Sequence, residues 1–347
     1  MAAAIDLNPR TLLRLPGVRE DRRTRAALIP LPGDGGEAGL LRALTLAPGF
    51  WIFDIDIHST RIPRFTFKAA DAPSLTVNHC FCGRCEVALH SGETTYLSGG
   101  ELVVDNGKST GSFYYPEADY EGIELAIRLD GDWQRAFLVL GESFAAPRQL
   151  FERCESVDAP RIYLADVPLA RTAKVLRDYL TQGKSRQLIA VKIMEWLLLL
   201  AERETVLVEA GKIYYPKTQV EIAKAVQQII VSDLQVRHPA AELAARFGIS
   251  ASSLKNYFCN VYGCGYAVYQ RTQRMKRAAK LLSGTRERVA DIAASVGYAS
   301  QTKFGSMFKK VYGVSPLTYR KQERLRLMKQ SVTAEGLAEK GEHSLEE

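Results

Sequence analysis

Long apolar runs are missing from this chain of 347 residues. The longest, from Trp196 to Ala201, has six residues and follows Glu195, whereas a membrane-spanning helix needs roughly 20 apolar residues. The first residues, MAAAIDLNPR, lack the basic segment followed by an apolar segment that begins a secretory signal. We therefore expect a cytoplasmic protein that has no membrane partner.

Sequence signatures of enzymes are also missing. The chain contains no nucleophile elbow, no phosphate-binding loop and no dinucleotide-binding fingerprint. Its 6 cysteines are better explained as reduced thiols than as a disulfide framework, because the chain is long and carries no secretory signal. We therefore predict a protein that is not an enzyme, has no catalytic residues and needs no cofactor.

Positive charge is concentrated in one part of the chain. Between residues 218 and 325 there are 17 Lys or Arg against 6 Asp or Glu. This region carries a net charge of +11, and since the whole chain carries +7, the remainder carries −4. Such a region suits the neutralisation of DNA phosphates with release of their counterions, although basic helices also face solvent or acidic partners.

Alternating polarity predicts an antiparallel sheet in the N-terminal part. In FWIFDIDIH, the residues Trp51, Phe53, Ile55 and Ile57 fall on one face, which predicts a half-buried strand. The pattern recurs in LTVNHC, CEVALH, ELVVD and GIELAIRL. Residues 1 to about 40, with two LPG motifs and GDGGEAG, are predicted to be mostly loop. Many short strands at this spacing indicate a small barrel or sandwich.

Helical periodicity follows after about residue 158. The segments VPLARTAKVLRDYL and LIAVKIMEWLLLLAERE place apolar residues at i, i+3, i+4 and i+7. The second is apolar around most of its circumference, so it needs more than one neighbour, either in a second subunit or elsewhere in the same chain. GKIYYPK predicts a linker, and the capping-box spacing of Thr218 and Glu221 predicts the start of a helix.

An internal duplication lies in the basic region. LAARFGISASSLKNYFCNVYG, residues 243–263, matches IAASVGYASQTKFGSMFKKVYG, residues 292–313. The offset is 49 up to Gly248 and Gly297 and 50 after them. Each copy predicts a helix, a turn at the glycine and a second helix, which is typical of a helix-turn-helix whose outer face is free to enter a major groove. The predicted inward positions of the second helices are Leu254, Phe258, Phe304 and Phe308.

One amphipathic helix is predicted between the two copies, from Tyr266 to Ser283. Its 18 residues span roughly 27 Å at 1.5 Å per residue, close to the ~34 Å of one turn of B-form DNA. One chain is therefore expected to reach two adjacent major grooves. The predicted inward positions of this helix are Val268, Thr272, Met275, Ala279 and Leu282.

The duplicated region resembles the AraC/XylS family of transcription regulators. GYASQTKFGSMFKKVYGVSPLTYRK is similar to the second helix-turn-helix signature of that family, and RMKRAAKLLSGT resembles the end of its connecting helix. The resemblance covers about 105 residues. GRCEVAL and YLSGGELVV are more loosely similar to the cupin-like sensor barrel of many members, and the siderophore-regulator type is the nearest likeness within the family.

The resemblance implies a sequence-specific activator that binds promoter DNA, answers a small-molecule effector, acts on RNA polymerase and forms a homodimer. The implied fold class is α+β multidomain, with an N-terminal cupin-like β-barrel and docking or dimerisation helices before an all-α tandem helix-turn-helix domain of seven helices. The predicted boundaries are 1–158 for a loop-rich segment and the barrel, 159–210 for the docking helices, 211–217 for a linker, 218–325 for the DNA-binding domain and 326–347 for a flexible tail.

The exposed faces of the two recognition helices supply the candidate DNA-binding residues. Asn and Gln can bridge adenine N6 and N7, and Lys can donate to guanine O6 and N7; contact with phosphate or water alone is the competing interpretation. Lys309 and Lys310, near a helix end, suit phosphate better than base edges. The remaining candidates are Ser252, Ser253, Lys255, Asn256, Gln301, Thr302, Lys303 and Ser306.

Two further groups lie in the predicted barrel. The first, which would suit an aromatic effector or be plain core, is Trp51, Phe53, Phe65, Phe67 and His79. The second is His79 with Cys80, Cys82 and Cys85, whose ligand types suit zinc or iron.

Strand alternation places His79 opposite Cys80 and Cys82, and the barrel lacks the His-x-His and Glu pattern of cupin enzymes, so we predict no metal. The alternative function is a zinc- or thiol-dependent sensor, or a DNA-repair-linked regulator, that uses Cys80, Cys82 and Cys85. A carbohydrate-binding barrel without regulatory output is a second alternative, disfavoured by the tandem helix-turn-helix.

Overall fold

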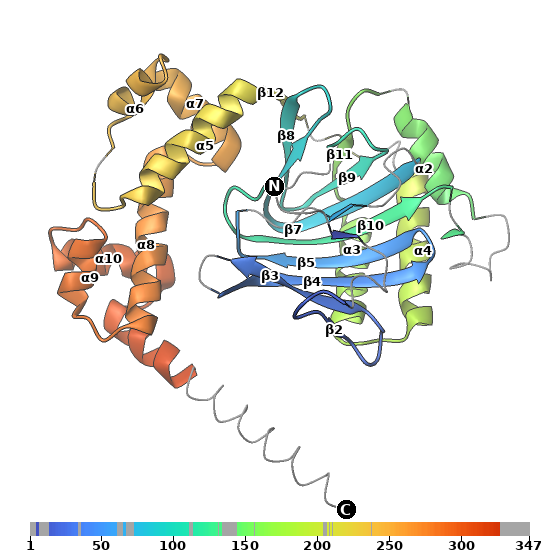
Figure 1. The fold of residues 1–347 in the computed structure, drawn as a ribbon, viewed down its shortest axis with the longest axis horizontal. Coiled ribbons are helices and arrows are strands. Elements are labelled where there is room, and N and C mark those ends of the chain that lie inside the picture. The colour runs from blue at the N-terminus through green and yellow to red at the C-terminus, as the bar shows by residue number, and fades with distance from the viewer. Residues whose placement is uncertain are drawn as a thin grey trace, which may run out of the picture. The chain divides into compact units, whose positions relative to one another are not determined.

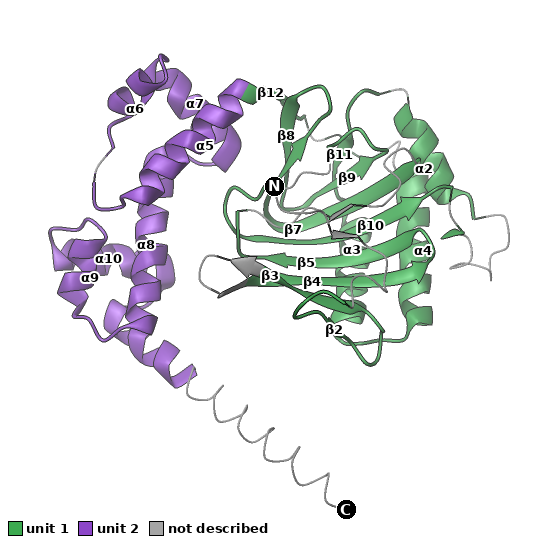
Figure 2. Cartoon of the chain, in the orientation of Figure 1, with its two compact units in different colours: residues 1–217 green, residues 218–347 purple. Residues whose placement is uncertain are grey.

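The computed structural model consists of two compact units, residues 1–217 and 218–347 (Figure 2). The first is rich in strands and the second is helical (Figure 1). The structure describes residues 5–6, 14–33, 36–60, 65–66, 73–110, 114–130, 132–133, 144–155, 157–203, 207, 209, 211–236 and 238–326.

A ten-stranded sheet forms the body of the first unit. Its main path runs in the order β11-β9-β7-β10-β5-β4-β3-β2, and all of its pairs are antiparallel. The short strands β1 (Ile5–Asp6) and β6 (Phe65–Thr66) pair with each other in parallel. The strands of the large sheet are β2 (Arg19–Glu20), β3 (Ala27–Gly33), β4 (Gly36–Ala47), β5 (Phe50–Ile57), β7 (Ser74–Ala88), β8 (Glu93–Ser98), β9 (Glu101–Asp105), β10 (Tyr120–Arg128), β11 (Arg161–Leu164) and β12 (Tyr215–Pro216).

Each face of this sheet builds its own apolar core. Ile52, Val77 and Leu125 pack with the helices α2 (Ala146–Glu155), α3 (Val167–Thr181) and α4 (Arg186–Arg203), which lie behind the sheet in Figure 1. Phe53 and Cys80 belong to the cluster on the opposite face, called here the inner face. Burial of apolar area on both sides therefore stabilises the sheet, with the helices covering one face.

Strand β5 corrects one prediction. It was expected to be half-buried, but its residues are buried on both faces except Asp56, which is partly exposed. Helix α3 covers the side that was predicted to face water, and Asp54 is tolerated there because two arginines pair with it. Polar residues at alternating positions therefore do not by themselves show that this face of a strand contacts solvent.

The prediction of loop for residues 1–40 was wrong over its second half. Strands β3 and β4 form a hairpin there, with Ile29 and Leu31 on the inner face. The prolines of β3 obscured the pattern. Pro30 and Pro32 lie beyond the short stretch in which β2 pairs with β3, so their missing N–H groups cost no bond to β2.

Two further boundaries differ from the prediction. LTVNHC and CEVALH form one strand, β7, with an irregularity opposite Glu121 and Gly122. The predicted helical region begins with a strand, β11, which pairs with β9. The tail, residues 327–347, lies outside the described part of the chain.

The predicted linker is fastened to the sheet. Tyr215 pairs with Thr94 in β8, and the Lys212 ammonium donates to both carboxylate oxygens of Glu101 at 2.7 and 2.6 Å. The Thr95 hydroxyl donates to the carbonyl of Ile213 at 3.2 Å. The chain therefore leaves the first unit as a strand and enters the second directly as a helix, since α5 begins at Lys217, one residue before the predicted cap.

The second unit is helical throughout its regular structure, and residues 316–326 form a further helical run after the named helices. Both predicted helix-turn-helix units and the connecting helix α8 are present with nearly the predicted bounds. Among the described residues, no helix is both long and apolar enough to span a bilayer. The named helices are α5 (Lys217–Ser232), α6 (Ala240–Arg246), α7 (Ala251–Tyr262), α8 (Tyr266–Gly284), α9 (Val289–Ser295) and α10 (Gln301–Tyr312).

Helix α8 turns a different face inward than the spacing predicted. Met275, Ala279 and Leu282 are buried as expected, but Val268 is 45% exposed and Thr272 is partly exposed. Tyr269 takes the inward place instead, because its ring packs against Phe258 and Tyr262 of the first helix-turn-helix unit. The inward face shifts because the two ends of α8 pack against different helix-turn-helix units.

Candidate nucleic-acid interface

Each helix-turn-helix unit is built around a glycine turn and a serine cap. Gly248 and Gly297 have φ of +65° and +81°, the left-handed conformation that ends α6 and α9. The Ser250 hydroxyl accepts from the N–H of Ser253 at 3.0 Å, and the Ser300 hydroxyl accepts from the N–H of Lys303 at 3.3 Å. The recognition helices α7 and α10 thus begin at equivalent places in the two units.

The duplication extends further than the sequence comparison indicated. Phe258, Tyr262 and Tyr269 form a ring triad with centroid separations of 4.4, 5.3 and 4.9 Å. The residues 50 positions later form a second triad with separations of 4.6, 5.4 and 5.1 Å. These later residues are Phe308, Tyr312 and Tyr319. The four predicted inward positions, Leu254, Phe258, Phe304 and Phe308, are all buried.

The outer faces of α7 and α10 carry the candidate DNA-binding residues. All ten are exposed except Ser253, which is partly exposed and contributes to the cap of α7. The side chains of Asn256 and Gln301 make no hydrogen bond within the described residues, so their amides are available to an outside partner. Lys309 and Lys310 lie in the last turn of α10. The capping serines Ser250 and Ser300 were not among the predicted residues, although an Asn, Asp, Ser or Thr before a helix is the usual signal of a cap.

The effector candidates of the first unit do not gather in one place. Trp51 and Phe53 are buried on the inner face. His79 is paired with Ile123 of the helix-covered core and stacks edge-on against Phe81, so it lies on the other face. Burial lowers the pKa of His79 to about 4. Phe67 lies outside the described residues, as does the side chain of Phe65.

A buried polar group on the inner face was missed. Asn78 donates from Nδ2 to the Glu124 carboxylate at 2.7 Å and accepts from the Tyr120 hydroxyl at 2.8 Å. Glu124 lies between Phe53 and Asn78 in the sheet register. Burial raises the pKa of Glu124 to about 7, the Asn78 bond opposes the rise and the charge of Asp105 adds to it. Such a carboxyl can change its charge near neutral pH.

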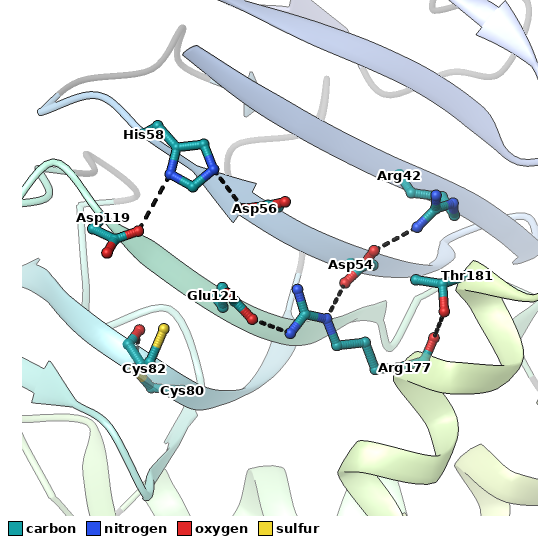
Figure 3. Close-up of polar contacts among 10 residues, drawn as sticks. All are labelled: Arg42, Asp54, Asp56, His58, Cys80, Cys82, Asp119, Glu121, Arg177 and Thr181. Atoms are coloured by element: carbon teal, nitrogen blue, oxygen red, sulfur yellow. Dashed lines mark hydrogen bonds and ion pairs between the residues drawn. The ribbon is translucent and has the colours of Figure 1, made fainter. Parts of the chain in front are cut away.

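An ion-pair network fastens α3 to the face of the sheet opposite the inner face (Figure 3). Asp54 accepts from Arg42 at 2.5 Å and from Arg177 of α3 at 2.8 Å, and Arg177 also pairs with Glu121. Burial raises the pKa of Asp54, although both arginines oppose the rise. Nearby, His58 lies between the carboxylates of Asp56 and Asp119 at 3.2 Å from each. The network fixes the position of α3, since removal of one member would leave buried charges unpaired.

The cysteine cluster is divided by the irregularity in β7, where Cys80 is paired with Gly122 and Cys82 with Glu121. Cys80 and Cys85 are buried on the inner face, whereas Cys82 is exposed. Burial raises the pKa of Cys80 to about 12 and that of Cys85 well above its ordinary value. Metal ligation and nucleophilic chemistry need the thiolate, so the alternative of a thiol-dependent function is not favoured. Within the described residues, no group of three or more His, Cys, Asp or Glu side chains is placed to hold a metal ion.

Known protein families include a match to the helical unit. A family model described as a helix-turn-helix domain matches residues 243–322. The arabinose operon regulatory protein of Salmonella typhimurium is 30% identical over 139 residues, which are 40% of this chain and 48% of that protein. The chain thus spans about half the length of the arabinose operon regulatory proteins that it matches.

Other comparisons extend along different lengths of the chain. The regulator ExsA of Pseudomonas aeruginosa is 23% identical over 270 residues, covering 72% of this chain and 93% of that protein. Among solved structures, the DNA-binding domain of AdpA in complex with a target DNA is 27% identical and covers 30% of this chain and 94% of that chain, with a TM-score of 0.28. These are proteins that the chain resembles.

Proposed function

We propose that this chain, which belongs through its C-terminal domain to the AraC/XylS family of transcription regulators, binds promoter DNA in two adjacent major grooves. The observation that carries the proposal is the pair of equivalent recognition helices, α7 and α10, each with an exposed polar face. Helix α8 joins the two units, and its 19 residues extend about 28 Å, close to one turn of DNA.

The residues that read bases are expected to differ from those that bind phosphate. Asn256→Ala or Gln301→Ala removes an amide suited to adenine, so each should cost about 1–3 kcal/mol of binding free energy and relax preference at one or two base pairs. Binding titrations on a promoter defined by footprinting would measure this. The two affected base positions should lie about one helical turn apart.

Lys309→Ala and Lys310→Ala are the matched controls for that experiment. They should weaken binding to all sequences nearly equally and reduce the salt dependence by about one unit for each phosphate that the lysine no longer neutralises. Unchanged affinity and unchanged base preference in both Asn256→Ala and Gln301→Ala would show that the reading faces are wrongly assigned.

The first unit is proposed to be a cupin-like sensor domain that regulates how the chain activates transcription through RNA polymerase. Its inner face offers Trp51 and Phe53 with the polar group around Glu124, which suits a small aromatic effector with a hydrogen-bond donor. A thermal-shift screen of small molecules would test it, because a ligand of the folded state raises the melting temperature. Assignment to the siderophore-regulator type stays a prediction.

Helix α4 is the proposed contact of a homodimer. Its inward residues are buried against the sheet, yet Leu188, Val191 and Leu198 are 48, 54 and 40% exposed along one side. An isologous contact would cover this stripe in both copies. Leu188→Glu and Leu198→Glu should shift the particle from dimer to monomer in light scattering, whereas Val167→Glu, at a still more exposed apolar residue at the start of α3, should leave the dimer intact. A wild-type chain that is monomeric at tens of micromolar would contradict the assignment.

A further inference from the structure

Side chains of the connecting helix bind the turn in front of the first helix-turn-helix unit, and that of Arg274 makes most of the contacts. Arg274 of α8 donates from Nε to the carbonyl of Leu234 at 2.7 Å, and from Nη2 to the carbonyls of Gln235 and Val236 at 3.2 Å each. Asp233 shapes this turn, because its carboxylate accepts from the N–H groups of Gln235 and Val236. The guanidinium therefore satisfies carbonyls of the turn that follows α5, which have no place in a helical hydrogen-bond pattern.

The same guanidinium also reaches the second helix-turn-helix unit. Its Nη1 lies 3.4 Å from the carbonyl of Gly297, and its carbon lies 5.9 Å from the ring centre of Tyr298. Gly297 is the turn residue between α9 and α10. A Cβ added at Gly297 would lie 2.7 Å from the carbonyl oxygen of Gln235 and 2.8 Å from the Arg274 guanidinium carbon. The turns of the two units therefore meet at Arg274.

The equivalent contact in the second repeat stays within that repeat. Arg324, 50 positions after Arg274, donates to the carbonyl of Thr285 at 3.2 Å, and Arg320 donates to the carbonyls of Leu282 and Glu287. These arginines fasten the segment before α9 to the helical run 316–326. Arg274 does the same for its own repeat and, in addition, joins one repeat to the other.

We propose that Arg274 is a positioning residue that fixes the separation and rotation of the two helix-turn-helix units and so sets the spacing of the two half-sites in the DNA. The proposal rests on the proposed DNA-binding function. A single helix such as α8 resists stretching but allows the units at its two ends to bend and twist relative to each other. A contact away from the helix axis removes that freedom, and the planar fork of arginine can span several carbonyls where a lysine ammonium cannot.

The test measures tolerance to half-site spacing. The full chain first selects its site from a pool of random-sequence DNA duplexes, and the selected duplex is then remade with one base pair added or removed between the half-sites. Each step moves the second half-site by about 3.4 Å and about 35°. Wild-type protein should lose about tenfold or more in affinity at each step, whereas Arg274→Ala should lose less than about threefold and bind the parent duplex more weakly.

Two variants separate geometry from charge and from folding. Arg274→Lys keeps the charge and, as the milder change, keeps the fold; it should show the same relaxed spacing as Arg274→Ala. Arg324→Ala removes the equivalent contact of the second repeat and should keep the wild-type spacing penalty. Circular dichroism checks that each variant is folded.

The outcomes distinguish this proposal from the proposed function. If folded Arg274→Ala or Arg274→Lys keeps the wild-type spacing penalty, or loses affinity equally at all spacings, the positioning role is overturned while DNA binding stands. If the wild-type chain selects no two-part site, the proposed DNA reading itself is overturned and the positioning role with it.

Discussion

Phe308→Ala is expected to destabilise the second helix-turn-helix unit by about 3–5 kcal/mol, the usual cost of deleting a buried aromatic ring and leaving a cavity. Phe308 is completely buried and its ring contacts those of Phe304, Tyr312 and Tyr319. Since these rings hold α10 and the following helical run together, the destabilisation should be local. Hydrogen exchange followed by mass spectrometry should show faster exchange in α9 and α10, with α6 and α7 nearly unchanged.

The duplication supplies the matched variants for that measurement. Phe258→Ala removes the equivalent ring of the first unit and should produce the mirrored result, with faster exchange in α6 and α7. Val311→Ala, at a residue that is 46% exposed, should change stability by less than about 0.5 kcal/mol. A uniform increase of exchange across both helix-turn-helix units in both ring variants would mean that the two repeats do not behave as separate folding units.

The second large effect concerns pH and Glu124. The folded protein holds the proton of Glu124 up to a pKa of about 7, whereas the unfolded chain releases it near the ordinary value of 4.5. The folded state therefore binds more protons between these values, so the free energy of unfolding falls as the pH rises through this window, by about 3 kcal/mol in total. Glu124→Gln carries no such proton. It should therefore be more stable than wild type above pH 7 and similar to it near pH 4.5.

The difference in the free energy of unfolding between wild type and Glu124→Gln separates the contribution of Glu124 from those of other titratable groups. His79, whose pKa is lowered to about 4, contributes with the opposite sign: its unfolded form takes up a proton as the pH falls below 6.5, which lowers stability on the acid side. Because His79 is present in both proteins, its contribution cancels. Chemical denaturation of wild type and Glu124→Gln across this range gives the difference, and a difference that does not vary with pH would contradict the raised pKa of Glu124.

The sequence by itself determined the helical unit nearly completely. Helix-turn-helix units are held together by local contacts, so glycine turns and apolar pairs at i, i+4 place the inward residues, as Leu254 and Phe308 illustrate. The duplication added a second, independent instance of the same pattern. Helices α3 and α4 were predicted for the same reason, since apolar residues recur along each of them at helical spacing.

The sheet was predicted only in part, because its contacts join distant parts of the chain. Alternation identified β5 and β10, but it could not tell which covering each face receives, so Asp54 was assigned to solvent rather than to Arg177 of a helix more than a hundred residues away. His79 was grouped with Trp51, although pairing with Ile123 places it on the opposite face. Register decides the face of every strand residue, and register is a tertiary property.

The contacts made by long polar side chains were likewise settled only by the tertiary structure. Arg274 is one of many basic residues in its region, and its spacing on α8 does not separate it from neighbours that face solvent. Its partners are backbone carbonyls, and any residue type supplies a carbonyl, so no sequence pattern marks them. The contact that joins the two repeats is therefore visible only in the tertiary structure, where the carbonyls of Leu234 and Gly297 lie beside the same guanidinium.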